Sequence, residues 1–248
     1  MKKKPATIVM VTCNRLNKTE VSLQSLLDKT KYPYNLIVID NNSTDGTRDY
    51  LLKNHEWFYR LVLLDDNKGP ARASNIGWSL GPKDYYVKFD NDIVVLKDNW
   101  LDALVALAND LDIYEWIGHS PLGQTFYKKN VNGHVIMTNS KMAHILGACN
   151  LVTKKAFDTI GYWNSKDFGV YGWEEFDYGV RLRMAGLDYC YAGGPGYVRH
   201  MGIEMDEADP PDYLVGKRRD RAAGEQLRYK ILNEYKSKTR PLKVSRPL

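Results

Sequence analysis

The chain has 248 residues, 44% of them hydrophobic and 26% charged, which is the composition of an ordinary soluble globular protein. No segment is long and apolar enough to span a bilayer, and the apolar run at residues 8–11 is too short for a signal peptide. The three cysteines show no paired spacing, which argues against a disulfide framework and predicts a reducing, cytoplasmic compartment.

Strand-length apolar runs alternate with helical patterns in the first half of the chain. Strands are predicted at residues 6–12, 35–40, 59–64 and 85–89, and helices at 16–27, 47–52 and 70–80. Because these strands are apolar almost throughout, the pattern predicts a parallel sheet covered by helices on both faces.

The second half is less regular. Helices are predicted at residues 99–108, 173–184 and 219–235, and short strands, some antiparallel, at 113–118, 134–137, 145–152, 189–191 and 197–200. Residues 205–215 are rich in Asp and Pro, which predicts a mobile loop. The length fits one domain or two closely fused halves.

The formal net charge of +5 is concentrated at the C-terminal end. Residues 217–248 contain eleven Lys and Arg against three Asp and Glu, a net charge of +8. Such a segment indicates contact with an acidic acceptor, with the inner surface of a membrane or with a nucleic acid. A solvated helix with a frayed end explains the charge equally well.

Polar and acidic residues follow each of the four predicted parallel strands, at residues 12–15, 40–42, 65–69 and 90–92. Ligands of an open parallel sheet bind outside the carboxyl ends of its strands, so these residues mark the predicted site. Gly69 precedes a predicted helix, whose start can accept a phosphate.

Asp90-Asn91-Asp92 places two carboxylates two residues apart after a buried strand, where they can converge on one hard cation. Mg²⁺ and Mn²⁺ prefer oxygen ligands and often retain phosphate oxygens. Taken alone, the same residues are an ordinary turn between strands.

A second group of carboxylates, Glu174, Glu175 and Asp177, opens a predicted helix beside Trp173. They can supply a general base in an aromatic cleft, where rings stack on the apolar faces of sugars. Carboxylates are favoured at any helix start, so a structural explanation stays open. His200 closes a later aromatic segment and gains meaning only beside the acidic turn.

Several of these segments, in this order, resemble family 2 of the inverting glycosyltransferases, which have the GT-A fold. They are residues 8–15, 38–47, 67–77, 90–92 and 172–177, with His200 as a late metal ligand. The resemblance implies an α/β fold in which a Rossmann-like nucleotide-binding half, residues 1–95, is fused to a smaller mixed-sheet acceptor half, residues 96–204. Residues 205–248 are then a loop and a basic C-terminal helix and tail.

The resemblance also implies a role for each matching residue. Those at the sheet edge would bind a nucleotide-diphosphate sugar, expected to be a UDP-sugar, with Asp40 at the base and Asp90 at the ribose or sugar. The implied donor contacts are Thr12, Asn14, Arg15, Asp40, Asn67, Gly69, Arg72, Asn75, Asp90 and Asn91. The implied ligands of Mn²⁺ or Mg²⁺ are Asp92 and His200, and the implied acceptor contacts are Trp173 and Asp177.

The implied reaction is an inverting displacement at the anomeric carbon. The metal would neutralise the departing diphosphate, and a carboxylate would remove the proton of an acceptor hydroxyl. Glu175 aligns with the usual base, but this chain has Glu-Glu where the family most often has Glu-Asp, so Glu174 stays a second candidate. A glycan, a lipid-linked saccharide, a protein and a nucleic acid all stay open as the acceptor.

Other classes of protein fit less well. A sugar-nucleotide pyrophosphorylase or a dinucleotide oxidoreductase needs a glycine-rich loop after the first strand, and residues 12–15 contain no glycine. Two alternatives stay open: a non-catalytic carbohydrate- or nucleic-acid-binding protein on the same scaffold, and a nucleic-acid-base glycosyltransferase that uses the basic tail. The predicted location is the cytoplasm, with peripheral contact at the inner membrane surface.

Overall fold

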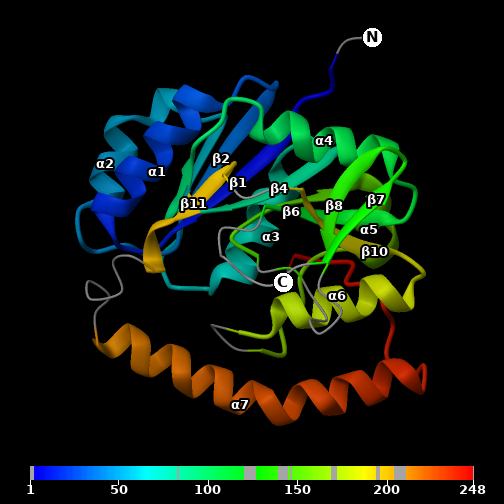
Figure 1. Ribbon diagram of the computed structural model, residues 1–248. Coiled ribbons are helices and arrows are strands. Elements are labelled where there is room, and N and C mark those ends of the chain that lie inside the picture. The colour runs from blue at the N-terminus through cyan, green and yellow to red at the C-terminus, as the bar shows by residue number, and fades with distance from the viewer. Residues whose placement is uncertain are drawn as a thin grey trace.

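The computed structural model describes residues 3–82, 84–119, 127–138, 145, 147–168, 172–193, 196–203 and 211–247, with the backbone alone for residues 203 and 211–221. Helices pack on both faces of one large mixed sheet, and a long C-terminal helix crosses the lower side of the molecule (Figure 1).

The sheet has the strand order β3-β2-β1-β4-β9-β6-β10-β8-β7. Its strands are β1 (Ala6–Thr12), β2 (Tyr34–Asp40), β3 (Arg60–Leu63), β4 (Tyr85–Asp90), β6 (Tyr114–Gly118), β7 (Tyr127–Val131), β8 (His134–Thr138), β9 (Cys149–Thr153) and β10 (Asp188–Ala192). A separate two-stranded sheet pairs β5 (Ile93–Val95) with β11 (Val198–His200). The helices are α1 (Leu16–Lys29), α2 (Thr47–Lys53), α3 (Pro70–Leu80), α4 (Trp100–Asp110), α5 (Lys154–Ile160), α6 (Glu174–Met184) and α7 (Pro211–Lys236), with short 3₁₀ turns at His55–Trp57 and Met201–Ile203.

The predicted parallel sheet of the first half is confirmed. Strand β1 lies between β2 and β4 and pairs in parallel with both, and β2 pairs in parallel with β3. In β1 six of the seven residues are buried, as expected for a strand with helices on both sides.

The two halves share a single sheet, because β9 lies between β4 and β6 and pairs antiparallel with both. The predicted strand at residues 145–152 is shorter in the structure and begins at Cys149. Among the strands and α-helices of the described residues, three were not predicted, and one of them, β5, has only three residues. Strand β7 has the polar sequence YKKNV and is mostly exposed, so it carries no apolar pattern, and α5 is only seven residues long.

Helix α7 begins earlier than the sequence indicates. The prediction of a mobile loop over residues 205–215 is wrong for residues 211–215, which form the first turns of α7, and residues 205–210 lie outside the described part of the chain. Pro211 is the first residue of this helix. Proline is well tolerated there because the backbone N–H groups of the first turn have no acceptor within the helix, so the missing N–H of proline costs no hydrogen bond. None of the helices in the described ranges is both long and apolar enough to cross a membrane.

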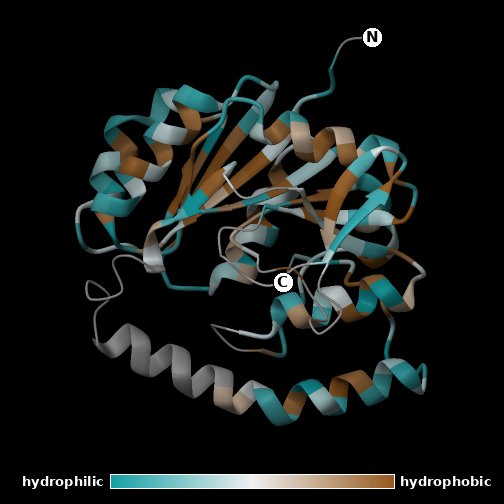
Figure 2. Cartoon of the chain, in the orientation of Figure 1, coloured by the Kyte–Doolittle hydropathy of each residue, from teal (hydrophilic) through white to brown (hydrophobic). Residues whose placement is uncertain are grey.

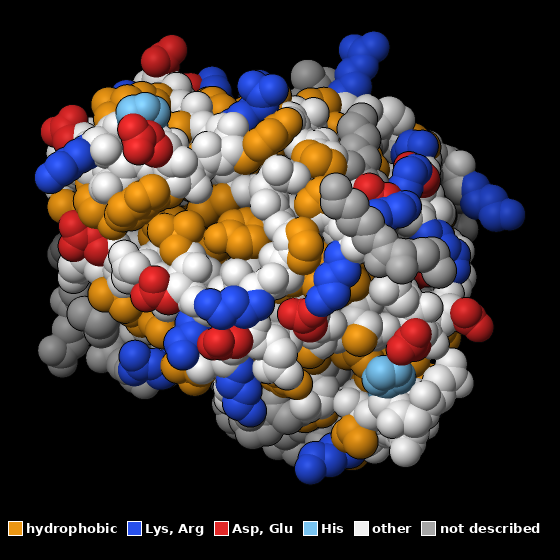
Figure 3. Space-filling view, turned by 90° about the horizontal axis from the view of Figure 1, so that it is seen from above, with side chains coloured by type: hydrophobic (Ala, Val, Ile, Leu, Met, Phe, Trp, Pro, Cys, Tyr) orange, Lys and Arg blue, Asp and Glu red, His pale blue; other side chains and the backbone are white. Residues whose placement is uncertain are grey.

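The core has a layer on each side of the sheet. One layer contains Trp100 and Leu104 of α4 against Phe89, and the other contains Trp78 of α3 and Tyr178 of α6. Hydrophobic residues accordingly concentrate on the strands and on the inward sides of the helices (Figure 2). On the face opposite α7, hydrophobic side chains gather in a hollow band among charged side chains of both signs (Figure 3).

Candidate active site

The ends of three adjacent strands bring three of the predicted donor residues together. Thr12 at the end of β1 is in register with Asp40 at the end of β2, and Val11 is in register with Asp90 of β4. The Thr12 hydroxyl donates to Oδ1 of Asp40 at 3.1 Å. Arg48 of α2 donates from Nε to Oδ2 of the same carboxylate at 2.9 Å. Asp40 is therefore fully buried and held from two sides.

The loop that connects β1 to α1 bends sharply toward the acidic turn. Asn14 and Arg15 have φ values of 57° and 65°, a left-handed conformation that is uncommon for residues other than glycine. The Asn14 side chain accepts from the Thr44 N–H at 2.7 Å, which fixes the bend. A hollow of about 460 Å³ opens at the start of α1 and is lined by both Asn14 and Arg15.

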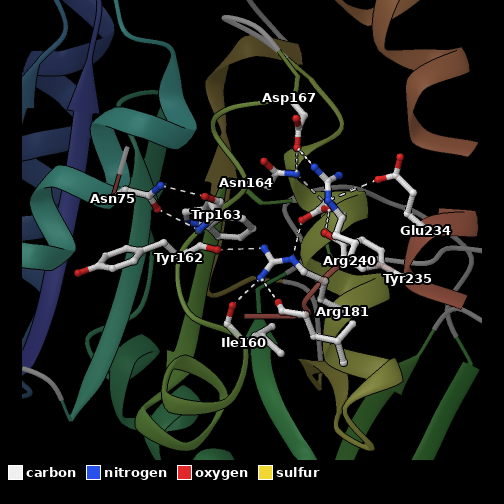
Figure 4. A network of polar contacts seen from close by, with 12 residues as sticks. Asn75, Ile160, Tyr162, Trp163, Asn164, Asp167, Arg181, Glu234, Tyr235 and Arg240 are labelled. Carbon is white, nitrogen blue, oxygen red and sulfur yellow. Dashed lines mark hydrogen bonds and ion pairs between the residues drawn. The ribbon is translucent and has the colours of Figure 1, made fainter. Parts of the chain in front are cut away.

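The third predicted motif divides into residues at the surface and residues in the core. Asn67 accepts at its Oδ1 from Asn41 Nδ2 at 2.8 Å and from the Gly69 N–H at 2.9 Å, and Arg72 is exposed. Asn75, by contrast, is fully buried and exchanges two hydrogen bonds of 3.0 Å with the backbone of Trp163 (Figure 4). Asn75 thus joins α3 to the segment before α6, and both polar atoms of its side chain are hydrogen-bonded in that contact.

The three residues of the acidic turn point in different directions. Asn91 is buried and donates to the Thr19 hydroxyl of α1 at 2.9 Å, so its amide group is engaged in holding the turn. Asp92 accepts at Oδ2 from Arg15 Nη1 at 3.1 Å. Its Oδ1 is buried without a hydrogen-bond partner among the described residues, and His200 Nε2 is 3.6 Å away.

Asp92 fits a divalent cation better than His200 does as it stands. In the described ranges no three His, Cys, Asp or Glu side chains converge as a metal site, but Mg²⁺ often uses one or two carboxylates and takes its other ligands from substrate phosphates. The unpaired buried oxygen of Asp92 suits that chemistry. The Gly202 N–H donates to Nδ1 of His200 at 2.9 Å, which assigns the proton of the neutral ring to Nε2. Ligation through Nε2 would therefore need the ring proton on Nδ1, and the hydrogen bond from the Gly202 N–H would have to break.

The predicted base lies at the start of α6. Burial raises the pKa of Glu175 to about 8, and the nearby Glu174 and Asp90 carboxylates add to this effect, whereas Lys88 opposes it. Burial also raises the pKa of Glu174. A Cβ on Gly147 would lie only 1.9 Å from Oε1 of Glu175, so the carboxylate packs directly against this glycine.

The two predicted acceptor contacts are engaged within the protein. The Trp173 ring is covered by the Arg228 guanidinium of α7, 3.9 Å from the ring centroid. Asp177 is 1% exposed and accepts from Arg181 Nε at 2.6 Å and from the Tyr235 hydroxyl at 2.7 Å. Arg181 and Tyr235 belong to a polar network that ties α6 to the C-terminal segment (Figure 4). Asp177 therefore has a structural place here and leaves no oxygen exposed to an acceptor.

Sequence reasoning missed two residues of this site, Arg48 and Lys88. Lys88 is 5% exposed in the middle of β4, where its ammonium contacts Asp90. A lysine inside an otherwise apolar strand is itself a signal, because lysine is almost never fully buried unless it is paired. Arg48 follows an ordinary turn and carries no such signal.

A mixed sheet with an acidic turn at the carboxyl edge of its parallel part is the arrangement of a GT-A type protein. Residues 7–162 match the family model described as glycosyl transferase family 2. Because this match covers more than half of the chain, the protein belongs to glycosyl transferase family 2. The fold and family predicted from the sequence are thereby confirmed.

Two curated relatives cover part of the chain. The teichuronic acid biosynthesis glycosyltransferase TuaG of Bacillus subtilis is 27% identical over 120 residues, 48% of this chain and 48% of that protein. The poly-β-1,6-N-acetyl-D-glucosamine synthase of Staphylococcus aureus is 24% identical over 204 residues, 75% of this chain and 49% of that protein. The chain thus spans about half the length of the curated relatives it matches.

Solved structures share the fold at low sequence identity. S. aureus TarS 1–349 in complex with UDP has a TM-score of 0.60 and 16% identity, with 79% of this chain and 60% of that chain covered. The mannosyltransferase PcManGT of Pyrobaculum calidifontis, in complex with GDP-Man and Mn²⁺, has a TM-score of 0.56 and 15% identity, with 77% and 58% covered.

Proposed function

We propose that this protein transfers a sugar from a UDP-sugar to a hydroxyl group of a glycan or polysaccharide, with inversion and with the help of a divalent metal. The observation that carries the proposal is the meeting of the donor-side carboxylate Asp90 and the base candidate Glu175 around Lys88 and Gly147. The names of the relatives support it, since TarS was solved with UDP and the S. aureus synthase builds a polysaccharide.

The donor would lie along the carboxyl ends of β1, β2 and β4. Asn14, Arg15, Asn67 and Arg72 are at least partly exposed there and can contact the nucleotide. Asp40 is the proposed partner of the nucleobase of the donor. Because Arg48 covers Asp40, Arg48 would move aside when the nucleobase binds. Asp90, whose side chain is 34% exposed, would contact the ribose or the sugar.

Asp92 would hold the metal, and His200 would be a second ligand only if its hydrogen bond from the Gly202 N–H breaks and the ring proton lies on Nδ1. When bound, a divalent metal neutralises the negative charge that develops on a departing diphosphate. Arg15 beside Asp92 can reach the same phosphates and add a positive charge.

Glu175 would act on the acceptor. As the acceptor oxygen forms its bond to the anomeric carbon, the bond from that carbon to the diphosphate oxygen breaks and UDP leaves with the electron pair. The hydroxyl proton passes to Glu175, whose raised pKa suits a base at neutral to alkaline pH. Glu174, buried beside it, is the second candidate.

The basic segment beyond residue 217 is a candidate contact for an acidic acceptor or an anionic membrane surface. The proposed transfer step uses none of its residues.

The test is UDP release from a panel of UDP-sugars with Mn²⁺, with and without oligosaccharide acceptors. We expect one donor to be cleaved, and Glu175→Gln to lower the rate by roughly 10²–10⁴-fold with UDP binding unchanged. The proposal fails if no nucleotide sugar binds, or if neither Glu175→Gln nor Glu174→Gln lowers the rate.

A further inference from the structure

Lys88 is a buried cation in the core of the sheet. It lies in the middle of β4, in register with Val9 of β1 on one side and Asn150 of β9 on the other, and is 5% exposed. An ammonium group removed from water is costly unless hydrogen bonds and an opposite charge compensate it. Its contacts are therefore expected to be specific.

The ammonium has two partners at short distance. It donates to Oδ1 of Asp90 at 2.5 Å and to the carbonyl oxygen of Gly147 at 2.8 Å. Lys88 and Asp90 are two residues apart on one strand, so their side chains leave the same face of the sheet. The Gly147 carbonyl also accepts from Asn150 Nδ2 at 2.8 Å, and the Asp90 N–H donates to the Ala148 carbonyl at 2.9 Å. The turn that contains Gly147 is thus anchored to β4 and to β9.

Gly147 contacts Glu175 on its other side. The space for a Cβ is taken by Oε1 of Glu175, and a backbone hydrogen bond from Gly147 favours the ionised carboxylate. A chain of direct contacts therefore runs from Asp90 through Lys88 and Gly147 to Glu175.

Three carboxylates interact with the single ammonium group of Lys88. The carboxylates of Asp90, Glu174 and Glu175 all interact with the Lys88 ammonium, and each favours its charged form. Burial alone lowers the pKa of Lys88, but these carboxylates more than reverse that effect. In return, Lys88 favours the ionised form of each carboxylate.

We propose that Lys88 is a positioning residue for sugar transfer: its ammonium holds the donor-side carboxylate Asp90 and, through Gly147, sets the place and the charge of Glu175. This inference rests on the proposed function. Lys88 does not touch substrate and takes no proton in the reaction. It fixes the separation of the two reacting sides and keeps the base ionisable inside a buried site.

The principal variant is Lys88→Met, which keeps most of the side-chain volume and removes the charge. An opposite charge nearby lowers the pKa of a carboxyl group by about 1–3 units, so its loss should move the Glu175 titration upward by about one unit. At pH 7 the ionised fraction of a base with a pKa near 8 would then fall about tenfold, and kcat with it.

Lys155→Met is the matched control. Lys155 also pairs with a buried carboxylate, Oε1 of Glu115 at 2.8 Å, at the junction of α5 and β6. This variant should keep the wild-type pH–rate profile. Lys88→Met should lose about tenfold in kcat at pH 7 and recover at high pH.

A direct readout separates this inference from the proposed function. The Glu175 carboxyl can be titrated by NMR of protein labelled with ¹³C at glutamate, with Glu175→Gln identifying its signal, whether or not a donor is cleaved. An upward shift in folded Lys88→Met supports the inference even if no transfer is found. An unchanged midpoint overturns it even if transfer is robust. If Lys88→Met does not fold, Gly147→Ala tests the same link, since its methyl displaces the Glu175 carboxylate, and an unchanged titration and rate would overturn the inference equally.

Discussion

Arg15 Nη1 lies 3.1 Å from Oδ2 of Asp92, while Oδ1 of the same carboxylate is buried without a hydrogen-bond partner in the described part of the chain. One oxygen is thus paired with an arginine, and the other is a buried acceptor that suits a cation. Arg15 reaches this position through its left-handed backbone at the start of α1. The same pair can therefore serve both the metal and the donor phosphates.

Asp92→Asn should weaken Mn²⁺ binding in the presence of UDP by at least about tenfold, because it replaces a charged oxygen ligand with a neutral amide. His200→Gln should have a smaller effect, since the Gly202 N–H holds its ring in the tautomer with Nε2 protonated. Isothermal titration with Mn²⁺ measures both variants. Asp98→Asn, at a side chain that is 54% exposed, is the control. Equal Mn²⁺ affinity for Asp92→Asn and wild type would contradict the assignment.

The rate of transfer should rise with pH through about 8, since Glu175 must lose its proton before it can act as a base. Its folded pKa lies above its ordinary value of 4.5, so the same group stabilises the fold below pH 4.5 and loses that contribution as pH rises through 8. Activity and stability should thus change in opposite directions in this range. A profile of kcat/KM against pH checks the change in activity. A profile of thermal unfolding temperature against pH checks the change in stability.

Glu174→Gln decides between the two base candidates. If Glu175 is the base, this variant keeps the rising limb of the pH profile but moves it to lower pH, because the Glu174 carboxylate raises the pKa of Glu175. Loss of the limb in Glu174→Gln, with the limb kept in Glu175→Gln, would assign the base to Glu174.

The sequence predicts the parallel part of the fold and the sheet edge well, for a local reason. Buried parallel strands are continuous apolar runs, and polar residues such as Asp40 and Asp92 must follow where each strand ends. Strand β9 lies between β4 and β6, and it follows β4 by about 60 residues along the chain. No local sequence pattern encodes a pairing over that distance.

Side-chain direction is the second limit. Asn91 stands between two aspartates but turns toward Thr19, and Asn75 turns toward Trp163. A sequence motif gives the position of an asparagine along the chain. It does not show whether the side-chain amide will bond to a ligand or to another group of the protein. Asp177 is the same case, because its partner Tyr235 comes from a helix 58 residues further on.

Arg181→Met should destabilise the protein by about 3–5 kcal/mol, because it leaves Asp177 as an uncompensated buried charge. The guanidinium also donates to the carbonyl oxygens of Ile160 and Tyr162, at 2.6 and 3.0 Å. Arg183→Met on the same helix is the control, since its side chain is 42% exposed and should contribute less than about 1 kcal/mol through its pair with Asp188. Urea unfolding compares them, and equal losses would contradict the structural role of Arg181.

His119 should make the fold sensitive to acid. It is buried, its Nε2 lies 2.8 Å from the Trp100 carbonyl oxygen, and its ring stacks on Tyr197. Burial lowers its pKa to about 4 from an ordinary 6.5, so the unfolded chain binds more protons between these values. The contribution of His119 to stability is thus complete above pH 6.5 and is lost as pH falls through 4. Between pH 7 and pH 4, the thermal unfolding temperatures of wild type and His119→Gln should converge, because the wild type loses this contribution. The control His55→Gln, at an exposed histidine, should run parallel to wild type. Parallel curves for His119→Gln would show that this ring is not held neutral.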